Sequence, residues 1–171
     1  MTANADSTVG AALQDTFREV MATVCTPVSV VTAMSGERPH GATVSAFASL
    51  SIRPPMVLVS LDTASELLSI IRETRMFGLN VLSRAQAELA ALFARKGRDK
   101  FVGVSWHFDS GVPRIAGASG FLACRAARLV QGGDHVVVLG DVLRADALDA
   151  DPLTYRGRAF GTHVALKETA A

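Results

Sequence analysis

The sequence predicts a mainly β, α+β domain in which an antiparallel barrel or sandwich carries a few attached helices. Three observations lead to this class. Apolar segments rich in β-branched residues are joined by short turn sequences, a pattern typical of strands paired as hairpins. Helical segments do not alternate regularly with strands, as they would around a doubly wound parallel sheet. The chain also lacks a GxGxxG motif after a strand and a GxxxxGKS/T motif, the fingerprints of dinucleotide-binding and P-loop folds.

The composition excludes several other classes of protein. The chain has 171 residues, 49% of them hydrophobic and 19% charged, with a net charge of +1. This length suits one domain, and the charge argues against nucleic acid as a main partner. No signal peptide or membrane span is expected, so we predict a soluble cytoplasmic protein. Cys25 and Cys124 are interpreted as buried free thiols. The low charge with a high apolar fraction indicates that a second subunit covers part of the surface.

The first half of the chain predicts one helix followed by strands. Residues 1–10 are small and polar, which predicts a disordered tail ahead of a single domain over 11–166 and a short C-terminal tail over 167–171. A first amphipathic helix ends before Pro27, with apolar residues at helical spacing: Leu13, Phe17, Val20, Met21 and Val24. Four strands follow over residues 28–34, 42–51, 56–61 and 76–82.

Two further helices and two long strands are predicted in the rest of the chain. Thr63 with Glu66 three residues later has the form of a capping box. The helix after it should bury Leu67, Leu68, Ile70 and Ile71, and a helix over 85–95 should bury Leu89, Leu92 and Phe93. After a loop through Trp106 and Pro113, strands over 120–130 and 135–145 are joined by a hairpin turn over 131–134, and a last short strand lies around 155–164.

The most informative segment for function is the predicted strand over 42–51. A period of two places a phenyl ring and four hydroxyls on one face: Thr43, Ser45, Phe47, Ser49 and Ser51. Such a face can be an ordinary solvent-facing sheet surface. It can also be the floor of a ligand site, where hydroxyls and backbone N–H groups meet the polar edges of a flat ring or a phosphate.

Other candidate features each allow two interpretations. The cations of residues 95–100 are either solvated at a helix end or a clamp for a pyrophosphate. The turns around His135 and over 155–158 are either surface turns or parts of a site. Because the four histidines are dispersed and neither cysteine lies at ligand spacing from them, no metal site is expected. No GxSxG motif indicates a nucleophile elbow.

Taken together, six segments in this order resemble a known family. After the N-terminal helix they are PVSVVTA, GATVSAFASLSIRPPMVLVSLD, FGLNVLS, FARKGRDKFVGVSW, GGDHVVVLGDV and YRGR, and the resemblance spans residues 17–158. The chain resembles the short-chain flavin reductases, the small reductase components of two-component flavin-dependent monooxygenases.

This resemblance implies a homodimer of an antiparallel Greek-key split β-barrel of the FMN-binding type, with short flanking helices and flavin at the subunit interface. It implies an oxidoreductase that uses NADH or NADPH to reduce FMN or FAD. The reduced flavin would then diffuse to a partner monooxygenase. Hydride transfer needs two flat rings held in position rather than an acid–base pair, which fits the absence of a catalytic triad.

The resemblance also implies roles for individual residues. Thr43, Val44, Ser45 and Ala46 would line the flavin ring, and Ser49 and Ser51 would continue toward the ribityl chain and phosphate. Ser60, Asp62 and Ser65 would lie near the phosphate or adenosine end, with Lys100 and Phe101 near the flavin tail. His135, with Tyr155, Arg156 and Gly157, would border the nicotinamide pocket.

One departure from the family pattern concerns Glu66, where relatives often have a small hydroxyl or amide residue. A carboxylate there suits the N-terminal end of a helix but repels a flavin phosphate. An alternative function is a flavin- or haem-binding module of the same barrel class without NAD(P)H turnover. A pyridoxamine-phosphate-type oxidase lacks support, since Arg53 alone would anchor a phosphate on the second and third strands.

Overall fold

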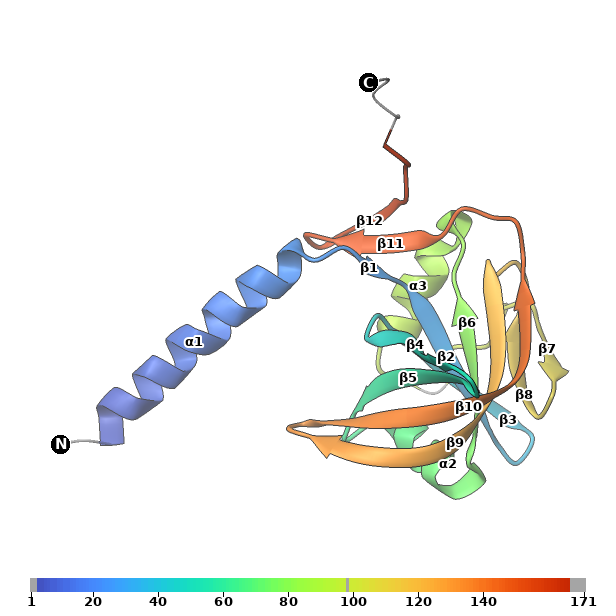
Figure 1. The fold of residues 1–171 in the computed structure, drawn as a ribbon, viewed down its shortest axis with the longest axis horizontal. Helices are drawn as coiled ribbons and strands as arrows, with labels where there is room; N and C mark the ends of the chain where they lie inside the picture. The colour runs from blue at the N-terminus through green and yellow to red at the C-terminus, as the bar shows by residue number, and fades with distance from the viewer. Residues whose placement is uncertain (1–2, 98, 167–171) are drawn as a thin grey trace.

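A mostly antiparallel β-structure forms the centre of the protein (Figure 1). The computed structural model describes residues 3–97 and 99–166. Within these residues one sheet has seven strands in the order β3-β2-β6-β9-β10-β5-β4. The bounds are β2 (Ser29–Ser35), β3 (Arg38–Val44), β4 (Phe47–Ile52), β5 (Pro55–Asp62), β6 (Met76–Val81), β9 (Gly120–Gly132) and β10 (His135–Ala147).

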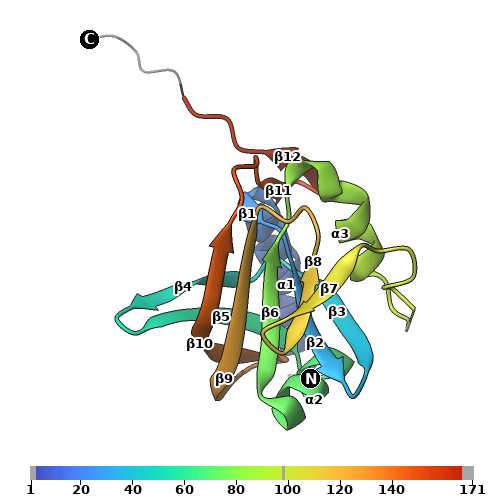
Figure 2. The same ribbon diagram turned by 90° about the vertical axis from the view of Figure 1, so that its right-hand side faces the viewer.

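The remaining elements lie around this sheet, except α1, which projects away from it (Figures 1 and 2). A three-stranded sheet has the order β1-β11-β12, and β7 pairs with β8. Their bounds are β1 (Thr26–Pro27), β7 (Trp106–Asp109), β8 (Val112–Ile115), β11 (Leu153–Arg156) and β12 (Ala159–Thr162). The helices are α1 (Ala3–Thr23), α2 (Glu66–Thr74) and α3 (Ala87–Ala94), the last preceded by a 3-10 turn over Arg84–Gln86.

The two edges of the seven-stranded sheet are consecutive in the chain. Only Ser45 and Ala46 connect the end of β3 to the start of β4. Three extended residue steps span at most about 11 Å, whereas seven strands laid flat would place their edges about 29 Å apart. The sheet therefore curls until its edges approach each other. The two edge strands do not pair, so the sheet is not closed.

Two helices cover the curled sheet and complete its core. The side chains that the sequence predicted to be buried on α2 are buried, and they join one core cluster with sheet residues such as Phe77. Helix α3 packs against β2 and β3 and buries Ala90 and Phe93, while Leu89 and Leu92 are only partly buried. Each fully buried large apolar side chain stabilises such a fold by about 1.5–3 kcal/mol.

The predicted single strand over 42–51 is wrong. The chain leaves β3 after Val44 and starts β4 at Phe47 on the opposite edge, so Thr43 and Ser49 do not share one strand face. Residues 45 and 46 cross between the two edges and belong to neither strand. The expected face of four hydroxyls around a ring is therefore divided between two strands.

Local signals at turns and caps had mixed outcomes. The hairpin turn between β9 and β10 is confirmed. The capping box at Thr63 is wrong, because its hydroxyl donates to the Asp134 carbonyl at 3.0 Å and α2 starts only at Glu66. A capping box forms instead between Ser83 and Gln86, which the sequence analysis did not identify. The loop predicted through Trp106 and Pro113 contains the β7–β8 hairpin.

Helix α1 starts earlier than the sequence predicted and extends away from the sheet (Figure 1). Residues 3–10, which were expected to form a tail, belong to this helix. Its apolar stripe is exposed, with Leu13 at 69% and Phe17 at 62%. Residues 167–171, predicted as the C-terminal tail, lie outside the described residues. None of the described helices combines the length and apolar character of a membrane span.

The two cysteines have different surroundings. Cys25 is exposed, so the expectation that both thiols are buried is wrong for it, since it lies just after α1. Cys124 is buried in the sheet, and burial raises the pKa of its thiol to about 12.

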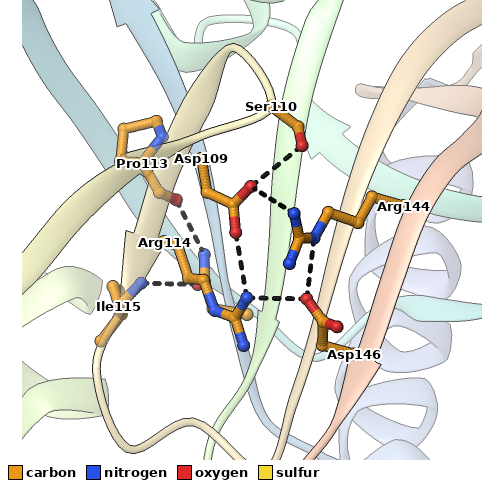
Figure 3. A network of polar contacts seen from close by, with 8 residues as sticks. Asp109, Ser110, Pro113, Arg114, Ile115, Arg144 and Asp146 are labelled. Carbon is orange, nitrogen blue, oxygen red and sulfur yellow. Dashed lines mark hydrogen bonds and ion pairs between the residues drawn. The ribbon is translucent and has the colours of Figure 1, made fainter.

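A network of ion pairs fixes the β7–β8 hairpin to β10 (Figure 3). The Arg114 guanidinium donates to Asp109 at 2.9 Å and to Asp146 at 2.7 Å, and Arg144 donates to Asp146 at 2.9 Å. The Asp109 side chain is only 10% exposed. Hydrogen bonds from Arg114 and Ser110 and the nearby Arg144 charge lower the pKa of Asp109, although burial opposes them.

We expect Asp109→Asn to lower the melting temperature at pH 7, because the variant cannot supply the carboxylate charge to Arg114. A carboxyl group with a lowered pKa stabilises the folded state above its ordinary pKa, about 4, and this contribution is lost as the pH falls through the lowered value. The difference from the unmodified protein should therefore shrink below about pH 4. Thermal unfolding followed by circular dichroism between pH 3 and 8 measures both effects.

The matched control is Asp151→Asn, which removes an exposed carboxylate 3.2 Å from Arg84. Exposed pairs of this kind contribute little, so this variant should unfold close to the original temperature. Equal behaviour of the two variants at pH 7 would contradict the role assigned to Asp109.

Candidate active site

A hollow lies beside the gap between the two sheet edges. It has a volume of about 260 Å³, and we call it the serine hollow. Strand β3, the link to β4, the end of β5 and the start of β10 supply its walls. They contribute Ala42, Thr43, Val44, Ser45, Ala46, Ser60, Leu61, Asp62, Ser65 and His135. The crossing of the chain from edge to edge is what brings these residues together.

Several hydroxyl groups of the serine hollow have no hydrogen-bond partner in the part of the chain that the structure describes. The side chains of Ser45, Ser60 and Ser65 make no hydrogen bond to another described residue, although each lines the hollow. The Thr43 hydroxyl differs, because it donates to the Ala90 carbonyl at 2.6 Å and can therefore only accept from a ligand. Small neighbours such as Ala46 leave room for a flat group with polar edges.

A histidine and a carboxylate meet at the rim of the serine hollow. The His135 Nδ1 atom lies 2.8 Å from the Asp134 carboxylate, and this hydrogen bond lowers the pKa of Asp134. A neutral imidazole that donates from Nδ1 keeps its Nε2 atom as an acceptor. Both the backbone N–H and the hydroxyl of Thr63 donate to the Asp134 carbonyl at 3.0 Å. These bonds join the turn carrying His135 to the segment that leads into α2.

A larger cavity adjoins the serine hollow and shares four of its residues, Ala42, Thr43, Asp62 and Ser65. It has a volume of about 470 Å³, and we call it the lysine cavity. Its other walls come from β3, the start of α2 and the end of α3 with the following loop. They contribute Pro39, His40, Gly41, Ala64, Glu66, Leu67, Phe93, Ala94, Arg95, Lys96, Gly97, Lys100 and Phe101.

Lys100 joins two backbone segments of the lysine cavity. Its Nζ atom donates to the Gly41 carbonyl at 3.2 Å and to the Phe93 carbonyl at 3.0 Å. Burial lowers the pKa of Lys100, while the charge of Glu66 opposes this shift. A Cβ atom on Gly41 would lie 2.7 Å from the Phe93 ring, so only glycine permits this close packing of α3 on β3.

A carboxylate lies in the same cavity. The Glu66 side chain is 57% exposed, and its carboxylate lies 3.9 Å from the His40 Nδ1 atom. Phe101 packs edge-on against Phe93, with ring centroids 4.9 Å apart. The lysine cavity thus contains both charge signs, whereas the serine hollow presents mainly hydroxyls and backbone.

Tyr155 lines a third, more apolar hollow of about 280 Å³ beside the first two. This tyrosine hollow is lined by Val28, Thr43, Ser45, Ala90, Ala94, Tyr155 and Phe160. Arg156 and Gly157 make other contacts, because the Arg156 Nε atom donates to the Thr23 carbonyl at 3.0 Å and the Gly157 N–H donates to the Ala22 carbonyl at 2.9 Å. These bonds satisfy carbonyls at the C-terminal end of α1.

The structure therefore brings together most of the residues that the sequence indicated. The serine hollow, the lysine cavity and the tyrosine hollow include eleven of them: Thr43, Val44, Ser45, Ala46, Ser60, Asp62, Ser65, Lys100, Phe101, His135 and Tyr155. Ser49 and Ser51 lie on edge strand β4 and line none of these three, because β4 starts beyond the crossing. The sequence analysis missed His40, which no motif identified.

The donor set of the serine hollow fits a flat heteroaromatic group. Unpartnered hydroxyls, small side chains and an imidazole offer donors and acceptors around a narrow floor. Among the described residues, no group of three or more histidine, cysteine or acidic side chains is arranged to hold a metal ion. The arrangement is therefore suited to binding and orienting a ring system.

Comparison with known proteins agrees with this geometry. Residues 21–163 match the family model of the flavin reductase like domain. The chain belongs to this flavin reductase family. One relative, the FMN reductase (NADH) SmoA of Agrobacterium fabrum, is 42% identical over 146 residues, which are 85% of this chain and 83% of the relative. The reductase component of a 4-nitrophenol 4-monooxygenase/4-nitrocatechol 2-monooxygenase of Rhodococcus opacus is 40% identical over 86% of this chain and 80% of its own.

Solved structures of other flavin reductase family members share the fold. Component B of the nitrilotriacetate monooxygenase from Mycobacterium thermoresistibile superposes with a TM-score of 0.88 and 31% identity, covering 95% of this chain and 93% of its own. An NADH:FAD oxidoreductase from Streptomyces globisporus, in complex with NAD and FAD fragments, gives a TM-score of 0.83 and 31% identity, covering 92% and 95%.

We expect Lys100→Met to reduce the free energy of unfolding by about 1–3 kcal/mol, because the carbonyls of Gly41 and Phe93 lose their shared donor. Methionine keeps the apolar stem, so the loss reports on the ammonium group. Urea denaturation of both proteins measures the difference. Lys96→Met is the control, since Lys96 is exposed, and its effect should stay within about 0.5 kcal/mol. A similar loss in both variants would contradict the bridging role of Lys100.

Proposed function

We propose that the protein is an NAD(P)H:flavin oxidoreductase that supplies reduced FMN or FAD to a partner monooxygenase. The observation that carries the proposal is the serine hollow, a small-residue floor with unpartnered hydroxyls and His135 at its rim, in a chain of the flavin reductase family. The printed names of the relatives, an FMN reductase using NADH and a monooxygenase reductase component, support the same reaction.

The flavin ring is assigned to the serine hollow. Backbone groups of residues 43–46 and the hydroxyls of Ser45 and Ser60 meet its polar edges, while Thr43 offers only an acceptor because its proton is donated to Ala90. Asp62, Ser65 and Phe101 line the path of the flavin tail into the lysine cavity, where Lys100 holds the wall in place. Ser49 and Ser51 lie on β4, so they contact the flavin only if its tail extends to that strand.

The nicotinamide is assigned to the side of the ring bordered by His135 and Tyr155. Asp134 orients the His135 imidazole through Nδ1, which leaves Nε2 to contact the carboxamide. Arg156 and Gly157 support this side of the site indirectly. Their hydrogen bonds fix the β11–β12 hairpin, which carries Tyr155, to α1.

When both are bound, the reduced nicotinamide and the flavin supply the hydride-transfer chemistry themselves. The residues of the chain hold the two rings at contact distance and restrict their relative orientation, which is worth several kcal/mol in a bimolecular step. Backbone N–H groups of the β3–β4 link would donate to the polar edge of the ring and so stabilise negative charge on it. The apolar walls of the tyrosine hollow, with Val28 and Phe160, exclude water from one side.

A homodimer of a Greek-key split β-barrel, located in the cytoplasm, is the assembly that we propose, with a single domain over residues 11–166. The support is the stripe along α1 and the residue just after it, where large apolar side chains are between 42% and 69% exposed: Leu13, Phe17, Val20, Met21 and Val24. A helix whose apolar face is largely exposed is stabilised when another subunit covers it. Ile52 on edge strand β4 is a further exposed apolar side chain, at 76%.

We expect the purified protein to oxidise NADH or NADPH, followed at 340 nm, only when FMN or FAD is added. His135→Ala should raise the KM for the nicotinamide nucleotide about tenfold, the effect of losing one hydrogen bond of about 1.4 kcal/mol. His107→Ala is the control, because His107 is an exposed imidazole on the distant hairpin strand β7.

Two outcomes would contradict these assignments. Flavin binding without oxidation of either nucleotide would favour a flavin-binding module without turnover. Equal kinetic constants for the His135 and His107 variants would remove His135 from the nicotinamide side.

We expect Phe17→Glu to weaken the dimer at least tenfold, because a carboxylate cannot be buried unpaired at an apolar contact. Sedimentation velocity over a concentration series measures the dissociation constant. Ala12→Glu adds the same charge, and at 100° per residue it falls on the other side of α1, so it should leave the dimer intact. A monomeric parent protein at micromolar concentration would refute the proposed assembly.

A further inference from the structure

The lysine cavity is much larger than a single phosphate group requires. Its volume of about 470 Å³ exceeds the 260 Å³ of the serine hollow, and the two share Ala42, Thr43, Asp62 and Ser65. With a flavin ring in the serine hollow, as proposed above, the tail of the flavin enters this cavity. FMN would place one terminal phosphate there, whereas FAD would place two phosphates and an adenosine.

The partly buried cation of this cavity already donates hydrogen bonds to the protein. Lys100 has three N–H donors, and two of them go to the carbonyls of Gly41 and Phe93. Glu66 is close enough for its charge to act on Lys100. A phosphate that entered beside Lys100 would therefore meet a cation with one remaining donor and a neighbouring negative charge.

Glu66 distinguishes chemically between the two flavin tails. Its carboxylate is a pure hydrogen-bond acceptor, placed in the cavity wall next to Ser65 at the start of α2. A terminal phosphate of FMN carries about −1.5 to −2 charges at neutral pH and offers mainly acceptors. The adenosine of FAD carries ribose hydroxyls and an exocyclic amine, which donate. Hydrogen bonding of a ribose hydroxyl to an acidic side chain is a common means of nucleotide recognition.

The exposed cations of the cavity suit a diphosphate better than a single group. Arg95 and Lys96 lie in the loop after α3 and are exposed, so they can pair with the negative charges of a phosphate at the mouth of the cavity. Glu66, in contrast, lies across the cavity on the α2 side, together with His40 at 3.9 Å. The positive mouth and the acidic wall thus offer separate places for phosphates and for hydrogen-bond donors.

We propose that this site selects FAD over FMN and that Glu66 is the specificity-determining residue, accepting a hydrogen bond from the adenosine portion and disfavouring a terminal phosphate. The inference rests on the proposed function, because it requires a flavin whose tail enters the lysine cavity.

The test measures the dissociation constants of oxidised FAD and FMN by isothermal titration calorimetry, without any nicotinamide nucleotide. The unmodified protein should bind FAD at least tenfold more tightly than FMN. In Glu66→Gln this ratio should fall at least tenfold, because FMN binds more tightly and FAD more weakly. The ratio of kcat/KM values for the two flavins should change in the same direction.

Glu73→Gln is the matched control. Glu73 lies on the same helix, is exposed, and does not line the cavity, so the variant should keep the original ratio. ADP provides a second measurement, because it carries the adenosine donors without a flavin ring. ADP should displace FAD from the unmodified protein, and at least several-fold higher concentrations should be needed with Glu66→Gln.

Equal affinities for FAD and FMN in the unmodified protein would overturn the inference, as would an unchanged ratio in Glu66→Gln. Both results are compatible with flavin reduction by the enzyme. Failure of the proposed function would look different, since neither flavin would then support oxidation of NADH or NADPH.

Discussion

The two-residue crossing from β3 to β4 is the constraint on which the site depends. Ser45 and Ala46 connect strands at opposite edges of a seven-stranded sheet, so the sheet has to curl. The Ser60 N–H donates to the Ala46 carbonyl at 2.8 Å and fixes the crossing against β5. The Ser45 hydroxyl makes no hydrogen bond to another described residue and lines the serine hollow, so it stays available to a ligand. The crossing thus supplies two of the residues that line this hollow, Ser45 and Ala46.

The walls of the site are held by contacts between elements distant in sequence. Lys100 joins the end of α3 to β3, and Thr63 joins the segment before α2 to the turn that carries His135. Neither side chain needs to touch a ligand to affect binding, because each fixes backbone that lines a cavity. Positioning of this kind suits hydride transfer, in which the rate depends on the distance and orientation of two rings. The protein holds the two rings in fixed positions, whereas an acid–base enzyme would supply side chains that gain and lose protons during the reaction.

The local patterns of the sequence predicted the elements better than their connections. The buried face of α2 and the β9–β10 hairpin follow from spacing and turn residues within about ten positions, and both are confirmed. The hydroxyl of Thr63 could not be assigned in this way, because its partner Asp134 is 71 residues away. The hydrogen bond of Arg156 could not be predicted for the same reason, because its partner Thr23 is 133 residues away in the sequence. Motif order indicated eleven residues that line the three hollows, whereas Ser49 and Ser51 lie on β4 outside them, beyond the end of the strand that was predicted to be unbroken.

The distribution of perturbed ionisable groups supports a positioning role for this protein. Asp109, Arg144 and Asp146 have shifted pKa values because they pair with one another and with Arg114 beneath the β7–β8 hairpin, and none of them lines the three hollows. Lys100 and Asp134, at those hollows and their rims, also have shifted pKa values. Burial lowers the pKa of Lys100, and the hydrogen bond with His135 lowers the pKa of Asp134. The Lys100 ammonium group holds a wall in place through two carbonyls, and Asp134 orients the His135 ring. A site built for proton abstraction would instead place an uncompensated base against its substrate, so the electrostatics agree with a reaction whose electrons move between two bound cofactors.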